Sequence, residues 1–302
     1  MRWRGVAVYL ALAFGLSWAT QVAVALATRE AGGLGTQLGF GILGVAVLLM
    51  WPPAIGAIVA RQWVERSGFR DAGLRRGPRR YVFLAWALPP LLTLLTMLIS
   101  LPIYPFDAGF SRLREMMGAS GAVAPLPLEV VVVAQVIQGL TIGTLVNCIF
   151  TFGEEFGWRG YLLPRLMTLL GPWPGLLAHG AIWGLWHAPL IGLTGYNYPQ
   201  HPLLGIPAFV VFCALLGVVL GWLRLAANSV LPPTVGHASL NAIAGLPLLV
   251  LTGVDTAVAG VLWSPVGWVV LLATIGVLQV TGALPRALAT PPPSTASAED
   301  RG

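Results

Sequence analysis

Apolar stretches recur along almost the whole chain, and short polar segments separate them. A helix needs about 20 mostly apolar residues to cross the hydrocarbon core of a bilayer. Eight stretches meet that requirement, at residues 5–28, 34–60, 81–103, 130–150, 174–193, 203–223, 230–251 and 261–284. The pattern therefore predicts an all-α, polytopic membrane protein with about eight transmembrane helices.

Composition supports the same fold class. The 302 residues are 57% hydrophobic and 9% charged, whereas a soluble domain carries about 25% charged residues. Residues 1–284 therefore indicate one integral membrane domain, and residues 285–302, which are rich in Pro, Ser and Ala, indicate a disordered cytoplasmic tail. Cys148 and Cys213 lie in apolar stretches without CxxC spacing, so we expect small core residues rather than a disulfide or a metal pair.

All seventeen basic residues are arginine, and most lie in segments beside the predicted spans. With the N-terminus in the cytoplasm, fourteen arginines lie on the cytoplasmic side, and only Arg29, Arg112 and Arg114 lie outside. This distribution follows the positive-inside rule and predicts a multi-pass protein of the plasma (inner) membrane with both termini in the cytoplasm. Topology explains the net charge of +6, so we expect no nucleic-acid partner.

The stretch FGEEFGWRG, residues 152–160, places three charges at the end of an apolar run. Charged residues within membrane spans are costly and are functional candidates by default. Glu155 and Arg159 are four apart and can pair on one helix face. Each residue of a helix turns by about 100°, so Glu154 faces elsewhere. A structural ion pair accounts for Glu155 and Arg159, but a structural role explains an unpaired Glu154 poorly.

Two later spans carry polar side chains at helical spacing. Trp183 and His187 are four apart, so the indole can form a wall beside the imidazole. His237 and Asn241 are also four apart, among small residues that let another helix approach closely. Each of these side chains could serve packing alone. Counted along the helices, Glu154, His187 and His237 all lie roughly 10–13 residues from the cytoplasmic helix ends, which predicts one polar cavity. We expect His179 and His201 to be non-catalytic.

The EExxxR, WxxxH and HxxxN motifs, in this order on separate spans, resemble the CPBP family of CAAX-processing and bacteriocin-immunity intramembrane endopeptidases. These are relatives of the type II CAAX prenyl endopeptidase. The resemblance covers about residues 130–251. One departure is Trp183, where the family commonly has phenylalanine, and we expect it to reshape the pocket wall. The resemblance implies that Glu155 and Arg159 support the site.

The resemblance also implies a glutamate-dependent protease that needs no cofactor. Glu154 would be the general base that activates water, and His187 would help to hold that water. His237 and Asn241 would stabilise the oxyanion. Substrates would be membrane-associated peptides or proteins cleaved near the cytoplasmic interface, and no residue here indicates a prenyl-binding groove.

Other classes of function stay open. Two histidines and a glutamate can ligate zinc, but no HExxH motif is present, and a ligand role for Glu154 would remove the base. Residues 118–121 spell the GxSG sequence of rhomboid-type serine proteases, yet Pro125 and Pro127 follow Ser120 too closely for a buried helix. A non-enzymatic immunity or scaffold protein is an alternative from another class, and a transporter fits less well because the polar residues cluster at one depth.

Overall fold

The computed structural model describes residues 2–30, 41–119 and 126–289. Most of these residues form helices, and no β-strand occurs among them beyond an isolated bridge between Phe106 and Leu251. The predicted all-α class is therefore confirmed. Ser120 and the tail residues 290–302 lie outside the described residues, while residues 285–289, expected in the tail, belong to the last helix.

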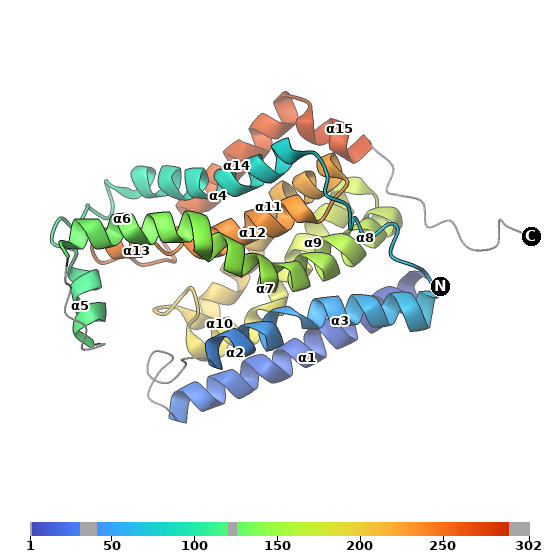
Figure 1. Cartoon of the computed structure of the whole chain (residues 1–302), viewed down its shortest axis with the longest axis horizontal. Coiled ribbons are helices and arrows are strands. Elements are labelled where there is room, and N and C mark those ends of the chain that lie inside the picture. The colour runs from blue at the N-terminus through green and yellow to red at the C-terminus, as the bar shows by residue number, and fades with distance from the viewer. Residues whose placement is uncertain (1, 31–40, 120–125, 290–302) are drawn as a thin grey trace, which may run out of the picture.

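Fifteen α-helices and three π-helical segments follow one another in the described part of the chain (Figure 1). They are α1 Arg2–Glu30, α2 Gly41–Met50, α3 Pro52–Val59, η1 Ala60–Glu65, α4 Arg79–Ser100, α5 Ser111–Ala119, α6 Leu128–Gln138, η2 Gly139–Gly143, α7 Thr144–Gly157, η3 Trp158–Leu162, α8 Leu163–Leu170, α9 Pro172–Trp186, α10 Ala188–Thr194, α11 Pro202–Ala227, α12 Leu231–Ile243, α13 Pro247–Val250, α14 Pro265–Val280 and α15 Ala283–Ala289.

Five helical stretches among the described residues are long and apolar enough to cross a membrane. They are Trp3–Ala27, Arg79–Ser100, Leu128–Leu170, Pro172–Thr194 and Pro202–Ala227. A sixth span results if α14 and α15, which are bent by 70° at their junction, count as one. The protein is thus a multi-pass membrane protein, but the predicted number of eight spans is not confirmed.

Two of the predicted spans are interrupted helices. Residues 34–60 contain a break at Trp51, where α3 begins with two prolines that lack the N–H groups needed to continue the preceding helix. Residues 230–251 contain α12 and the short α13, separated by residues 244–246. Conversely, the span predicted at 130–150 is part of one helical stretch of 43 residues, Leu128–Leu170, which carries the EExxxR motif in its interior.

Close helix packing surrounds the segment that holds this motif. The helix α12 packs against α4 and α7, and α11 packs against α9. Glycines permit the second contact, because a Cβ on Gly180 would lie 2.7 Å from Ala214 Cα and one on Gly184 would lie 2.6 Å from Val210 Cα. Such small residues let transmembrane helices approach closely. The C-terminal end of α9 is thereby held against α11.

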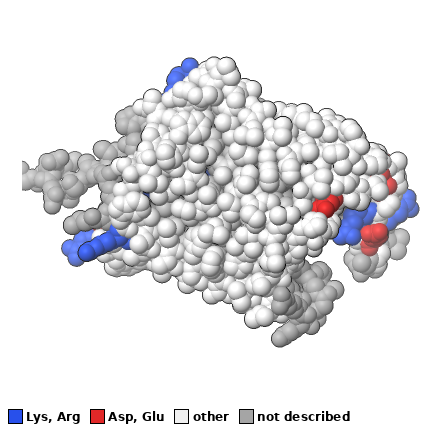
Figure 2. Space-filling view, turned by 180° about the vertical axis from the view of Figure 1, so that it is seen from behind, with Lys and Arg blue, Asp and Glu red and all other residues white. Residues whose placement is uncertain are grey.

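Charged side chains gather toward two ends of the molecule, and a broad uncharged surface lies between them (Figure 2). Exposed arginines are concentrated in the segment from residue 66 to residue 80, while α5 carries exposed Arg112, Arg114 and Glu115. The beginning of α1 and the helix α15 lie at the same end of the molecule (Figure 1). An uncharged band with charged ends is what a bilayer requires of a protein that spans it.

Candidate active site

Two glutamates on α7 lie beside side chains of α9 and α12. Glu154 Oε2 accepts a hydrogen bond of 2.9 Å from the indole N–H of Trp183 on α9. The ring centroid of Trp183 is 5.2 Å from that of His237 on α12, edge to face. The hydroxyl of Thr151 donates to the carbonyl of Thr234 at 3.1 Å and so ties α7 to α12. Three helices therefore meet around Glu154, which is buried.

One carboxylate oxygen of Glu155 accepts two hydrogen bonds. Its Oε1 accepts a hydrogen bond of 2.6 Å from Arg159 Nη1 and one of 2.9 Å from His237 Nδ1. The side chains of Glu155 and Arg159 are both 0% exposed. Their helical spacing predicted this pair, whereas the contact with His237 joins residues 82 apart and had no local signal. Removing one partner of such a pair costs about 3–5 kcal/mol, because a buried charge stays uncompensated.

Trp183 contacts Glu154 directly, and it contacts Arg159, which in turn pairs with Glu155. Its N–H binds Glu154, and the guanidinium carbon of Arg159 lies over the ring, 4.1 Å from the centroid. Its ring also lies 6.0 Å from that of His187, as a wall residue would. The indole therefore does more than form a wall beside the imidazole, since a desolvated cation–π contact contributes about 2 kcal/mol. Sequence spacing gave no sign of either polar contact.

His187 lies between the end of α9 and the start of α10. Its Nδ1 is 2.9 Å from the carbonyl of Trp183. A carbonyl only accepts, so Nδ1 carries the proton, and Nε2 of the neutral ring has a free lone pair. The rings of Trp186 and Phe209 pack edge-on at 4.7 and 4.8 Å and fix the plane of the imidazole. The side chain is partly exposed, so Nε2 can accept a hydrogen bond from water.

His237 and Asn241 lie one turn apart on α12. Asn241 is exposed, and its amide makes no hydrogen bond to any residue that the structure describes. The proton on Nδ1 of His237 is committed to Glu155, so Nε2 of that ring donates only when both nitrogens are protonated.

Among the described residues, the remaining histidines and the cysteines make no side-chain hydrogen bond to this group. His179 is fully buried, and His201 pairs with Asp255 at 2.9 Å beyond the end of α10. Cys148 is half-buried and Cys213 is buried, and both are free. Across the described ranges, no group of three or more His, Cys, Asp or Glu side chains could hold a metal ion.

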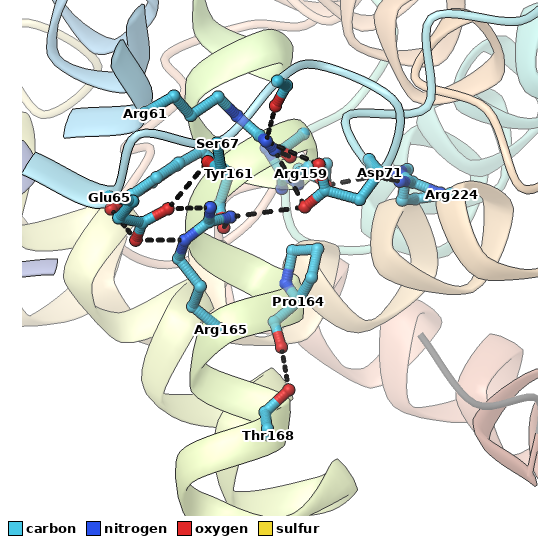
Figure 3. Close-up of polar contacts among 12 residues, drawn as sticks. Arg61, Glu65, Ser67, Asp71, Arg159, Tyr161, Pro164, Arg165, Thr168 and Arg224 are labelled. Carbon is cyan, nitrogen blue, oxygen red and sulfur yellow. Dashed lines mark hydrogen bonds and ion pairs between the residues drawn. The ribbon is translucent and has the colours of Figure 1, made fainter. Parts of the chain in front are cut away.

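A second polar group escaped the sequence analysis, and we call it the arginine cluster (Figure 3). It consists of Arg61, Glu65, Asp71, Arg165 and Arg224. Arg61 binds both carboxylate oxygens of Asp71, at 2.5 and 3.2 Å. Arg165 binds both oxygens of Glu65, with Nε to Oε1 at 2.8 Å. These pairs join residues up to 100 positions apart.

The arginine cluster binds backbone carbonyls at the C-terminal end of the EExxxR motif. Arg224 Nε donates to the carbonyl of Arg159 at 3.1 Å, and its Nη2 donates to the carbonyl of Asp71 at 3.1 Å. Arg61 Nη2 donates to the carbonyl of Gly160 at 2.8 Å. The carbonyls of Arg159 and Gly160 belong to η3, a π-helical turn, and such turns recur at functional sites.

The arginine cluster corrects one expectation from the sequence. We expected its arginines in segments beside the spans, yet Arg61, Arg165 and Arg224 are at most 5% exposed. Burial alone would raise the pKa of Glu65, but the hydrogen bond and charge of Arg165 outweigh burial and lower that pKa below its usual value. Counts of arginine along a chain do not distinguish a buried ion pair from a loop charge.

These features define a class: a multi-pass membrane protein with a largely buried site of two glutamates, two histidines, an arginine and a tryptophan. Comparison with known proteins shows which family the site-bearing segment resembles. Residues 135–243 match the family described as type II CAAX prenyl endopeptidase Rce1-like. This segment contains every residue of the EExxxR, WxxxH and HxxxN motifs. The chain is therefore similar to this Rce1-like family over that segment.

One curated relative supports the assignment. The chain is similar to CAAX prenyl protease 2 of Methanococcus maripaludis, with 29% identity over 93 residues. The alignment covers 29% of this chain and 34% of the relative. The chain thus matches about a third of that relative's length.

Proposed function

We propose that this protein is an intramembrane endopeptidase in which Glu154 activates a water molecule. The observation that carries the proposal is the contrast between the two adjacent glutamates. Glu155 is neutralised by Arg159, while Glu154 receives only an indole hydrogen bond through Oε2. Its Oε1 makes no hydrogen bond to the described residues and is free to accept a proton from water.

The proposed reaction needs no covalent intermediate. Water attacks the carbonyl carbon of the peptide as Glu154 takes one of its protons, and His187 Nε2 accepts a hydrogen bond from the other. The tetrahedral intermediate then collapses, the C–N bond breaks, and Glu154 returns the proton to the leaving amine. Asn241 and the doubly protonated ring of His237 would donate to the oxyanion, and each such donor lowers the barrier by roughly 3–4 kcal/mol.

Membrane-associated peptides are the proposed substrates, because Glu154, Trp183 and His187 lie on helical stretches that are long and apolar enough to cross a membrane. The relative from Methanococcus maripaludis is named CAAX prenyl protease 2, so a farnesylated peptide ending in a CAAX sequence is the first probe. The arginine-rich segment 66–80 supports a cytoplasmic position for the neighbouring helix ends, and hence for both termini.

The test is an assay of peptide release by purified protein in liposomes. The probes are the farnesylated CAAX peptide and its unprenylated counterpart, each with a fluorophore and a quencher on opposite sides of the scissile bond. Glu154→Gln and His187→Ala should abolish or strongly reduce release while the protein still folds and inserts. Ser120→Ala should leave it intact, and a strong chelator should not reduce it.

Several outcomes contradict the proposal. Release that survives Glu154→Gln removes the role of this carboxylate. Loss of release with chelator indicates the zinc-dependent version of the protease, and loss with Ser120→Ala indicates a serine nucleophile. No release of either probe by the wild-type protein would favour a non-enzymatic membrane role.

A further inference from the structure

His187 lies at a helix break, and part of that break has a local cause. The residue has φ −84° and ψ −3°, between Trp186 at the end of α9 and Ala188 at the start of α10. Pro189 lacks an N–H, so it cannot bond to the carbonyl four residues earlier. Pro189 thus explains the missing helical bond at its own position. It does not explain why the N–H of Leu190 also lacks its helical bond.

The next bond is replaced by a side chain from α1. In a continuous helix the N–H of Leu190 would donate to the carbonyl of Trp186. Instead, the Leu190 N–H donates to Gln21 Oε1 at 3.1 Å, and Gln21 Nε2 donates to the Trp186 carbonyl at 3.0 Å. The indole N–H of Trp18 donates to the same carbonyl at 3.1 Å. The amide of Gln21 is thus inserted into the helical ladder, which is a known cause of sharp kinks.

From this insertion we infer that Gln21 is a positioning residue for His187. The residues it binds flank His187 on both sides, and Gln21 itself is 1% exposed. Holding the break open fixes the backbone of His187. The bond from its Nδ1 to the Trp183 carbonyl then fixes which ring nitrogen remains for water. The inference rests on the proposed function, in which His187 holds the attacking water.

Gln21 lies well outside residues 135–243, the segment that matches the family. The helix α1 therefore contributes to the geometry of the site through this amide. A purely structural role for Gln21, as an anchor of α1, is the competing explanation. Ser17 gives the matched control, since it is buried one turn earlier on α1 and donates instead to the carbonyl of Leu49 at 3.4 Å.

The experiment compares Gln21→Leu, Gln21→Glu and Ser17→Ala in the peptide-release assay with the farnesylated probe. Gln21→Leu should lower kcat by at least about tenfold and leave KM within about twofold, because the water is misplaced while the peptide still binds. Ser17→Ala should behave as wild type. A proportionate loss in both variants would overturn the inference in favour of simple anchoring.

Gln21→Glu gives a readout that an anchoring role would not produce. A protonated carboxyl is nearly isosteric with the amide, accepts from the Leu190 N–H and donates to the Trp186 carbonyl, whereas an ionised one cannot donate. The kcat of this variant, divided by that of wild type at the same pH, should therefore rise as the pH falls. A ratio that does not change with pH contradicts the inference, even if Gln21→Leu fails to fold.

A second measurement is independent of peptidase activity. Diethyl pyrocarbonate modifies neutral imidazoles, and peptide mass spectrometry reports each histidine separately. The rate at His187 relative to the exposed His201 should change in Gln21→Leu and not in Ser17→Ala. If the wild-type protein cleaves no probe, the proposed function fails while this arm still tests the positioning. An unchanged relative rate in a folded Gln21→Leu protein refutes it.

Discussion

The indole N–H of Trp183 donates to Glu154 Oε2 at 2.9 Å, and the face of the same ring carries the guanidinium of Arg159 at 4.1 Å. Trp183 therefore contacts both Glu154, which we propose activates water, and Arg159 of the Glu155–Arg159 ion pair. The two contacts use different parts of the ring, the N–H and the π face. They can therefore be removed separately.

Trp183→Phe removes the N–H donor and keeps a smaller aromatic face for Arg159. This hydrogen bond orients the carboxylate, and a hydrogen bond to a charged group is worth roughly 1.5–3 kcal/mol, so we expect kcat to fall by about 10- to 150-fold. Trp183→Leu should lose about another tenfold, because Arg159 then also loses its aromatic partner. Kinetics with the farnesylated probe measure both.

Trp222→Phe provides the control for this pair. Trp222 is buried against Tyr81, and its N–H makes no hydrogen bond among the described residues. Its replacement should leave kcat unchanged. Equal activity of Trp183→Phe and Trp183→Leu would show that the cation–π contact contributes nothing.

The Glu155–Arg159 pair should behave as a coupled unit in stability measurements. Glu155→Gln and Arg159→Met should each lower the free energy of unfolding by about 3–5 kcal/mol, because each leaves an uncompensated buried charge. The double variant should lose much less than the sum. Unfolding by denaturant in micelles gives the three values for the double-mutant cycle.

An exposed pair supplies the comparison for this cycle. Arg112 and Glu115 lie 3.2 Å apart with side chains more than 60% exposed. Glu115→Gln should change stability by less than about 1 kcal/mol. Additive losses in the Glu155 and Arg159 variants would mean that the two side chains do not depend on each other.

The fold class and the motif residues were accessible from the sequence because both follow local rules. Mean hydropathy over windows of about 20 residues identifies membrane segments, and spacing by four identifies side chains on one helix face. The pairing of Glu155 with Arg159 follows from that spacing. These rules act within one helix and need no tertiary structure.

The features that were missed depend on contacts between distant parts of the chain. The window that covered residues 34–60 averaged over the break at Trp51, so the two short helices were not distinguished. Arg61 counts as a cytoplasmic charge until Asp71 and Gly160 are seen around it. Gln21 has no motif at all, since its partners are 165 and 169 residues away.

The ion pair of Glu65 with Arg165 predicts a specific pH dependence of stability. Folding lowers the pKa of Glu65 below its usual value of 4.5. Its ionised form therefore stabilises the folded state fully above that value, and the contribution is lost as the pH falls through the lower folded pKa. The gap in melting temperature between wild type and Glu65→Gln should be constant near neutral pH and close in this acidic window.

Scanning calorimetry in detergent between neutral pH and about pH 3 checks this behaviour. Glu115→Gln serves again as the exposed control, with a small gap at every pH. A gap for Glu65→Gln that widens as the pH falls would mean that the sign of the effect is wrong. Such a result would mean that the folded protein favours the protonated form of Glu65 over the ionised form.

Gly73 tests whether the arginine cluster positions the EExxxR segment. It has φ +76°, and a Cβ there would lie 2.7 Å from the guanidinium carbon of Arg224. Gly73→Ala should therefore displace Arg224 from the carbonyl of Arg159, in addition to a backbone strain of about 1 kcal/mol.

Gly68→Ala, in the same loop, adds its methyl group to open space and has no positive φ. We expect Gly73→Ala to lower both the melting temperature and kcat, and Gly68→Ala to change neither. Were Gly73→Ala to melt earlier and keep its full kcat, the arginine cluster would stabilise the fold without positioning Arg159.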